Sequence, residues 1–159
     1  MTHAPRFRSL AFVDLPRPDF ADVVIIARHP RTPEDPEAWA RAIFSPDSAP
    51  GWVKALFGLR AVLAPLIGLE GAPQGVFEVD RVEGEEALIS ADDRHLDFRC
   101  AVGVDVEAGL VRVTTAVRLK GWRGRVYFAP VRLLHPTVVE AMLRRAARRL
   151  AREGLATGG

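Results

Sequence analysis

The sequence contains one cysteine, Cys100, among its 159 residues. A single cysteine excludes an internal disulfide and any metal site built from several thiolates. It also suits a reducing compartment, so we expect a cytoplasmic protein.

Long apolar runs are missing as well. The first twenty residues carry charged side chains and prolines, with no apolar core of signal-peptide length. The most apolar stretch, residues 52–69, is interrupted by Lys54, Arg60 and Pro65. Because a spanning helix needs about 20 apolar residues, the sequence predicts neither secretion nor a membrane span.

The sequence also lacks the motifs that are typical of cofactor binding or of a known enzymatic reaction. It has no glycine-rich dinucleotide loop, phosphate-binding loop, paired-histidine zinc helix or nucleophile elbow. Its four histidines stand at positions 3, 29, 95 and 135, without ligand-like spacing. We therefore predict no cofactor and no metal, and no motif assigns a reaction.

The composition is that of one globular domain, with 48% hydrophobic and 26% charged residues. We expect a loose lead-in at 1–19, a single domain at 20–153 and a flexible tail at 154–159. The net charge is +2, yet residues 118–159 hold 10 Lys/Arg against 2 Asp/Glu. This basic end suits a solvated helix face or a surface that docks an acidic protein. Nucleic acid is not expected, because the basic residues lack interleaved aromatics.

The periodicity of the apolar residues predicts an α+β fold. Val23–Ile26 has the β-branched composition of a buried strand, and helices are expected at 36–44 and 52–69. Five further strands with a period of two follow, at 74–82, 85–91, 95–107, 110–120 and 123–131. A long amphipathic helix is expected to begin near His135-Pro136. The predicted architecture is a curved antiparallel sheet of about six or seven strands with this helix packed on it.

The strongest local feature is the run His95-Leu96-Asp97-Phe98-Arg99, called here the HLDFR box. Alternation along a strand puts His95, Asp97 and Arg99 on one face and the apolar residues on the other. These three side chains suit proton transfer and oxyanion binding in a cavity. They equally suit a solvated face on which the charges pair with neighbours, so both alternatives stay open.

Other candidates are isolated polar residues in apolar surroundings. Arg60 lies within an apolar helix, where it either reaches solvent or is held by a buried partner. Thr115 and Tyr127 carry hydroxyl groups that could contact a ligand or be satisfied by the backbone. Cys100 is expected to be a small buried hydrophobe, and His135 to begin the last helix.

Four stretches of the sequence occur together: 39–44, 52–69, the HLDFR box, and Gly124–Phe128 running on to His135. Through them the chain resembles, over roughly residues 20–150, a bacterial family of domains of unknown function, family 2867. That family is similar to the START and polyketide-cyclase-like helix-grip (SRPBCC) superfamily. The resemblance implies a curved sheet around a long C-terminal helix, with an apolar ligand-binding cavity between them. It also implies a possible partner of short-chain-dehydrogenase type, although this chain has no dinucleotide-binding half.

Three functions follow as hypotheses. The first is binding of a small hydrophobic or amphipathic ligand between sheet and last helix, with Arg60, Thr115, Tyr127, His95 and Arg99 as polar contacts. The second is a cyclase or isomerase in the same cavity, with His95, Asp97 and Arg99 as catalytic candidates. The third is a protein-interaction module or an accessory domain for an oxidoreductase.

Overall fold

The computed structural model describes residues 8–55 and 77–156, which form a five-stranded antiparallel sheet in the order β1-β5-β4-β3-β2. The strands are β1 (Phe20–Ala27), β2 (Arg81–Glu83), β3 (Glu86–Asp92), β4 (Leu96–Asp105) and β5 (Leu110–Leu119). The helical elements are α1 (Leu10–Asp14), α2 (Pro36–Phe44), the 3-10 turn η1 (Pro46–Ser48) and α4 (Gly121–Ala156). Residues 51–55 are also helical.

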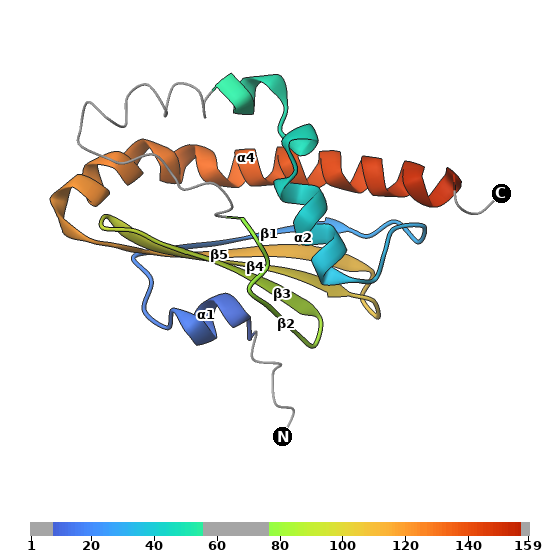
Figure 1. The fold of residues 1–159 in the computed structure, drawn as a ribbon, viewed down its shortest axis with the longest axis horizontal. Helices are drawn as coiled ribbons and strands as arrows, with labels where there is room; N and C mark the ends of the chain where they lie inside the picture. The colour runs from blue at the N-terminus through green and yellow to red at the C-terminus, as the bar shows by residue number, and fades with distance from the viewer. Residues whose placement is uncertain (1–7, 56–76, 157–159) are drawn as a thin grey trace.

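The sheet is covered on both faces (Figure 1). We call the face that meets α2 and α4 the inner face, and the face that meets α1 the outer face. The main core fills the inner side, where Trp39, Ile43 and Leu143 pack on β-branched residues of the sheet. A smaller cluster under α1 joins Ala11 and Leu15 to Leu88 on the outer face.

Several predicted elements are confirmed. The expected helix over 36–44 is α2, capped by the Asp35 carboxylate, which accepts hydrogen bonds from the next turn. The alternating segments at 85–91, 95–107 and 110–120 correspond to β3, β4 and β5. The first strand is longer than its β-branched centre, because β1 pairs with β5 from Phe20 to Ala27. Most of the predicted helix over 52–69, including Arg60, lies outside the described residues.

The prediction of a strand over 123–131 is wrong, because these residues belong to α4. The sheet therefore has five strands, and the last helix begins at Gly121, fourteen residues before His135. Pro130 and Pro136 lie on the solvent side of this helix, where the carbonyls that lose a donor can be hydrated. Prolines thus interrupt the local hydrogen bonding without ending the helix.

Gly124 shows why the start of α4 can lie so close to the sheet. A Cβ atom at this position would be 2.4 Å from the backbone oxygen of His95, which a side chain cannot tolerate. The same oxygen accepts a 2.7 Å hydrogen bond from the Lys120 backbone N–H. The β3–β4 turn and the first turn of α4 are therefore in direct contact, and α4 runs from there along the inner face.

The expected irregular lead-in also needs correction. Residues Leu10–Asp14 form α1, whose N-cap Ser9 accepts a hydrogen bond from Ala11. The backbone N–H of Leu10 donates to the buried Glu86 carboxylate at 2.7 Å. One short helical turn thereby covers apolar residues of the outer face.

Candidate functional site

Three polar side chains interrupt the apolar inner face: Asp22 on β1, Thr115 on β5 and His135 on α4. Asp22 and Thr115 are direct partners in the β1–β5 register, so their side chains leave the same face of the sheet side by side. His135 reaches Asp22 from the helix above. We call these three residues the inner polar cluster.

The Asp22–His135 contact joins β1 to α4 by a hydrogen bond. The Nδ1 atom of His135 lies 2.7 Å from Oδ2 of Asp22, and only 17% and 13% of the two side chains is exposed. A carboxylate only accepts hydrogen bonds, so Nδ1 donates and the imidazole is held in one orientation. The His135 ring also meets the edge of Phe20, with 5.6 Å between ring centroids. The pair is therefore shielded by an aromatic ring on one side.

Two oxygen atoms of the inner polar cluster lack a partner. Among the described residues, neither Oδ1 of Asp22 nor Oγ1 of Thr115 has an oxygen or nitrogen hydrogen-bond partner, although the Thr115 side chain contacts the Cys100 thiol; both atoms are buried. Thr115 is 1% exposed, and its neighbour across the strand on β4 is the weakly polar thiol of Cys100. Each buried oxygen left unpaired costs about 1–3 kcal/mol. Within the described part of the chain, the cluster thus presents one unpaired acceptor and, on the neighbouring strand, one hydroxyl whose partner is at most a weakly polar thiol.

Cys100 next to this cluster is not a nucleophile. Burial raises the pKa of its thiol to about 12, with the Asp22 charge acting in the same direction and a contact with the Thr115 side chain opposing it. A thiol with that pKa stays protonated and unreactive at neutral pH. Cys100 is therefore a small buried hydrophobe, as the sequence predicted. The described residues also contain no group of three or more His, Cys, Asp or Glu side chains placed to hold a metal ion.

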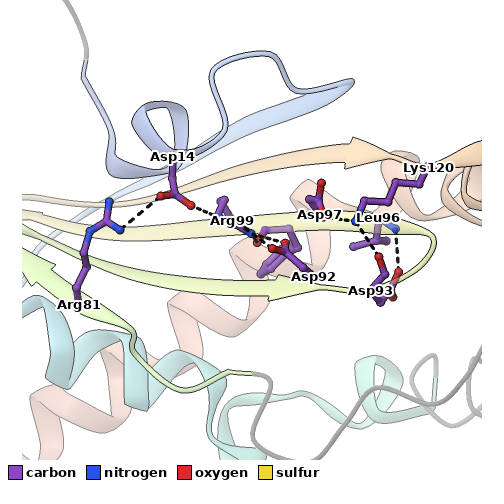
Figure 2. A network of polar contacts seen from close by, with 9 residues as sticks. Asp14, Arg81, Asp92, Asp93, Leu96, Asp97, Arg99 and Lys120 are labelled. Atoms are coloured by element: carbon purple, nitrogen blue, oxygen red, sulfur yellow. Dashed lines mark hydrogen bonds and ion pairs between the residues drawn. The ribbon is translucent and has the colours of Figure 1, made fainter.

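The HLDFR box splits between the two faces as strand alternation predicted. Leu96 and Phe98 share the inner face with Cys100, whereas Asp97 and Arg99 point to the outer face, where α1 lies (Figure 2). His95 precedes β4, and its Nε2 atom is buried without a hydrogen-bond partner in the described part of the chain. Asp97 and Arg99 therefore do not line the space between the sheet and α4.

Arg99 is the centre of an ion-pair network on the outer face (Figure 2). Its guanidinium donates two hydrogen bonds to the Asp92 carboxylate, at 2.5 and 3.1 Å, and its Nε donates to Asp14 at the end of α1. The hydrogen bonds from Arg99 lower the pKa of both carboxyls below their ordinary value, against the opposing effect of burial. Arg81 reaches the other oxygen of Asp14 at 3.4 Å. This network fastens α1 to the sheet.

The beginning of the HLDFR box organises the β3–β4 turn. The Asp93 carboxylate accepts hydrogen bonds from the backbone N–H groups of His95 and Leu96 at 2.5 and 2.8 Å, which closes the turn. Asp97 pairs with the ammonium group of Lys120 at 2.5 Å, just before α4. The box thus joins a hairpin, the start of α4 and, through Arg99, α1.

The inner polar cluster contains one predicted candidate, Thr115. Tyr127 is half-buried in α4, beside the buried Phe128. Asp22 and His135 were not among the candidates, although both left a signal in the sequence. Asp22 is a polar residue two positions after Phe20, on the face of β1 that points toward the core. His135 continues the helical spacing of Gly124 and Phe128, which identifies it as a residue of the helix face that meets the sheet.

Comparison with known proteins places the chain in a family. The sequence matches the family described as protein of unknown function DUF2867 over residues 15–142. The chain belongs to the DUF2867 family. A search of curated proteins and a search of solved structures gave no match. The inner polar cluster and the HLDFR box both lie within the matched residues.

Two open hollows indent the surface of this DUF2867 domain. One, of about 420 Å³, lies between α2 and the residues before β2, where the rings of Phe44 and Phe77 stack 4.9 Å apart. The other, of about 280 Å³, lies between the ends of β1 and β5 and the first half of α4, and Phe20 and Phe128 line it. Phe20 thus stands between the second hollow and the inner polar cluster.

Several arginines in the C-terminal part of α4 already have hydrogen-bond or ion-pair partners within the DUF2867 domain. Arg145 donates to the backbone oxygen of Asp47, and Arg149 donates to the Ser45 hydroxyl, at 2.8 and 2.7 Å. Arg144 pairs with Glu140 on the helix surface at 2.7 Å. These arginines tie α4 to η1 or to their own helix, which leaves less of this face for an acidic partner. Among the described residues, none of the helices combines the length and apolarity that crossing a bilayer requires.

Proposed function

We propose that this DUF2867 domain binds a small amphipathic molecule between the inner face of the sheet and the first half of α4. The observation that carries the proposal is a pair of buried oxygens on neighbouring strands of an otherwise apolar face, Oδ1 of Asp22 and Oγ1 of Thr115, for which the described residues supply no oxygen or nitrogen partner. A buried polar atom without a partner lowers the stability of the fold, and a bound molecule that forms a hydrogen bond with it removes this penalty.

The chemistry of these atoms sets the polar end of the ligand. Oδ1 of Asp22 accepts only, so the ligand supplies an N–H or O–H donor, while the Thr115 hydroxyl both donates and accepts. A hydroxyl, an amide or an amine next to a carbonyl satisfies both atoms. The ring of Phe20, which meets His135 and Phe128, offers an apolar surface to the rest of the molecule.

The arrangement of the elements supports a helix-grip interpretation of the fold. A long C-terminal helix lies along one face of an antiparallel sheet, and the polar cluster lies between them. The START-like resemblance implies a ligand in the same place. The expected oxidoreductase partner rests on the resemblance alone.

Titration with N-phenyl-1-naphthylamine tests the proposal. This neutral probe carries an aromatic body and one N–H donor, and its fluorescence rises in an apolar site. We expect saturable binding that Asp22→Asn and Thr115→Val weaken. The matched control is Thr114→Val, because Thr114 is equally buried but points to the outer face. Absence of saturable binding, or binding that all three variants leave unchanged, would contradict the proposal.

Acid–base catalysis is a second candidate, favoured by the 2.7 Å Asp22–His135 contact. A carboxylate that orients an imidazole through Nδ1 leaves Nε2 to exchange a proton with a bound carbonyl compound. The isomerase-like chemistry then belongs to His135, with Asp22 as its positioning residue. The test is solvent-deuterium incorporation next to the carbonyl of simple ketones, measured for the wild type and His135→Gln. Equal incorporation in both proteins removes this candidate.

A further inference from the structure

The hollow beside Phe20 differs from the inner polar cluster in its charge. It is lined by apolar side chains and by two arginines, Arg125 and Arg132, with Asp19 at the rim. The arginines stand seven residues apart, two turns of α4, so they project from the same side of the helix. Phe128 lies between them in the chain, one helical turn from each. The hollow therefore combines an aromatic floor with two cations.

Neither arginine has an ion pair within the described residues. Arg125 and Arg132 are both exposed, and no carboxylate of the described chain lies in ion-pair contact with either. The rim carboxylate of Asp19 is already engaged, because its Oδ2 accepts the backbone N–H of Leu119 at 2.7 Å. From residue 121 to residue 139, α4 contains no acidic side chain at all. The positive charge at this hollow is therefore not neutralised by the helix that carries it.

The aromatic contacts connect the hollow with the proposed ligand site. The ring of Phe20 makes edge contacts with Phe128, with 5.1 Å between centroids, and with His135, with 5.6 Å between centroids. A molecule whose apolar body rests on Phe20 and Phe128 lies in the same hollow as the two guanidinium groups, and the Phe20 ring stands between it and His135 of the inner polar cluster. Guanidinium groups hold carboxylate, sulfonate or phosphate oxygens with paired hydrogen bonds.

We propose that the ligand is an amphipathic anion, whose acidic group is held by Arg125 and Arg132 while its apolar body lies on Phe20 and Phe128. The inference rests on the proposed binding function and names the chemical class of its ligand. A volume of about 280 Å³ suits a compact aryl or short alkyl acid.

Two matched fluorescent probes separate this inference from the proposed function. N-phenyl-1-naphthylamine is neutral, and 8-anilinonaphthalene-1-sulfonate is the same arylamine with a sulfonate added. We expect the full-length wild type to bind the sulfonate about tenfold more tightly, the ratio that 1.4 kcal/mol provides. The double variant Arg125→Gln/Arg132→Gln should reduce this preference to within about twofold. Arg123→Gln is the control, because Arg123 is an exposed arginine of the same helix that does not line the hollow.

The outcomes are distinct. Equal affinity for the two probes, or a preference that the double variant retains, overturns the anion inference. In that case, neutral-probe binding that Thr115→Val weakens still supports the proposed function. A sulfonate preference that Arg123→Gln removes as strongly as the double variant does also overturns the inference, because it shows a diffuse charge effect. Failure of both probes to bind overturns the proposed function together with the inference.

Discussion

Replacing Thr115 by valine separates the stability of the ligand-free protein from its ability to bind. The side chain is 1% exposed, and among the described residues its hydroxyl has no oxygen or nitrogen partner, only a contact with the weakly polar Cys100 thiol. Valine has nearly the same shape without the polar group. Because a buried unpaired hydroxyl costs about 1–3 kcal/mol, we expect Thr115→Val to raise the free energy of unfolding by about 1 kcal/mol or more. For a domain of this size, that gain raises the Tm by about 2–4 °C per kcal/mol.

The same substitution should weaken binding, since the ligand loses its partner at Thr115. One neutral hydrogen bond is worth about 0.5–1.5 kcal/mol, so we expect about a threefold to tenfold loss of probe affinity. Chemical denaturation measures the first effect, and titration with N-phenyl-1-naphthylamine measures the second. A residue kept for function at a cost in stability shows opposite signs in the two assays.

Thr114→Val provides the matched comparison. Thr114 is 0% exposed and its hydroxyl is also unpartnered within the described residues, but it lies on the outer face under α1. We expect a similar gain in stability and no change in binding. If Thr115→Val instead lowers the free energy of unfolding by more than about 1 kcal/mol while Thr114→Val does not, the Thr115 hydroxyl is satisfied within the protein and the reasoning fails.

Three further predictions concern the contacts around the site. Gly124→Ala should destabilise the protein by about 1–3 kcal/mol, because its Cβ would meet the His95 backbone oxygen at 2.4 Å; denaturant midpoints equal to or above wild type would contradict this packing. Arg99→Gln should cost about 1–2 kcal/mol at pH 7. Since Arg99 lowers the pKa of Asp14, this stabilisation is complete above the unfolded-state value of about 4 and is lost as the pH falls through the lower folded-state pKa. The free energies of unfolding of the two proteins should therefore differ by a constant amount above about pH 4 and approach each other as the pH is lowered further; a difference that does not shrink on acidification refutes the linkage. Cys100, whose pKa is raised to about 12, should react with a thiol reagent only at the rate of unfolding; rapid labelling of the folded protein would disprove its burial.

Local patterns in the sequence were enough to predict the strands β3, β4 and β5. Apolar residues recur at every second position along much of these strands, and the Glu83-Gly84 turn before β3 and the Ala108-Gly109 turn between β4 and β5 place glycine at positive φ, 58° and 64°. Such turns fix antiparallel neighbours, and the apolar set then fixes which residues face the core. The division of the HLDFR box between two faces follows from the same rule.

The start of α4 was predicted wrongly because local strand propensity and two prolines opposed the helical spacing of the inward-facing residues. The aromatic and β-branched residues after Arg123 favour a strand, and Pro130 and Pro136 favour an interruption. The inward-facing residues Gly124, Phe128 and His135 nevertheless keep helical spacing across both prolines. Packing of that face on the sheet outweighs the propensity of the solvent-facing positions, which is why tertiary context decides the element.

The candidate site could not be derived from local patterns, because its members come from three separate elements. Nothing in the sequence near Asp22 indicates that it pairs with a residue 113 positions later. The HLDFR box stands out because its base, acid and cation occupy alternate positions of one segment, and charged side chains on one face of a strand are easily paired with one another and with charges on neighbouring elements. In this fold Arg99 pairs with Asp14 on α1 and Asp92 on β3, and Asp97 pairs with Lys120 just before α4. These ion pairs hold elements of the fold together. Asp22 and Thr115 each have a buried oxygen without an oxygen or nitrogen hydrogen-bond partner among the described residues. Unused hydrogen-bonding capacity in an apolar interface, more than the density of charged residues, is therefore the feature that points to a ligand in this domain.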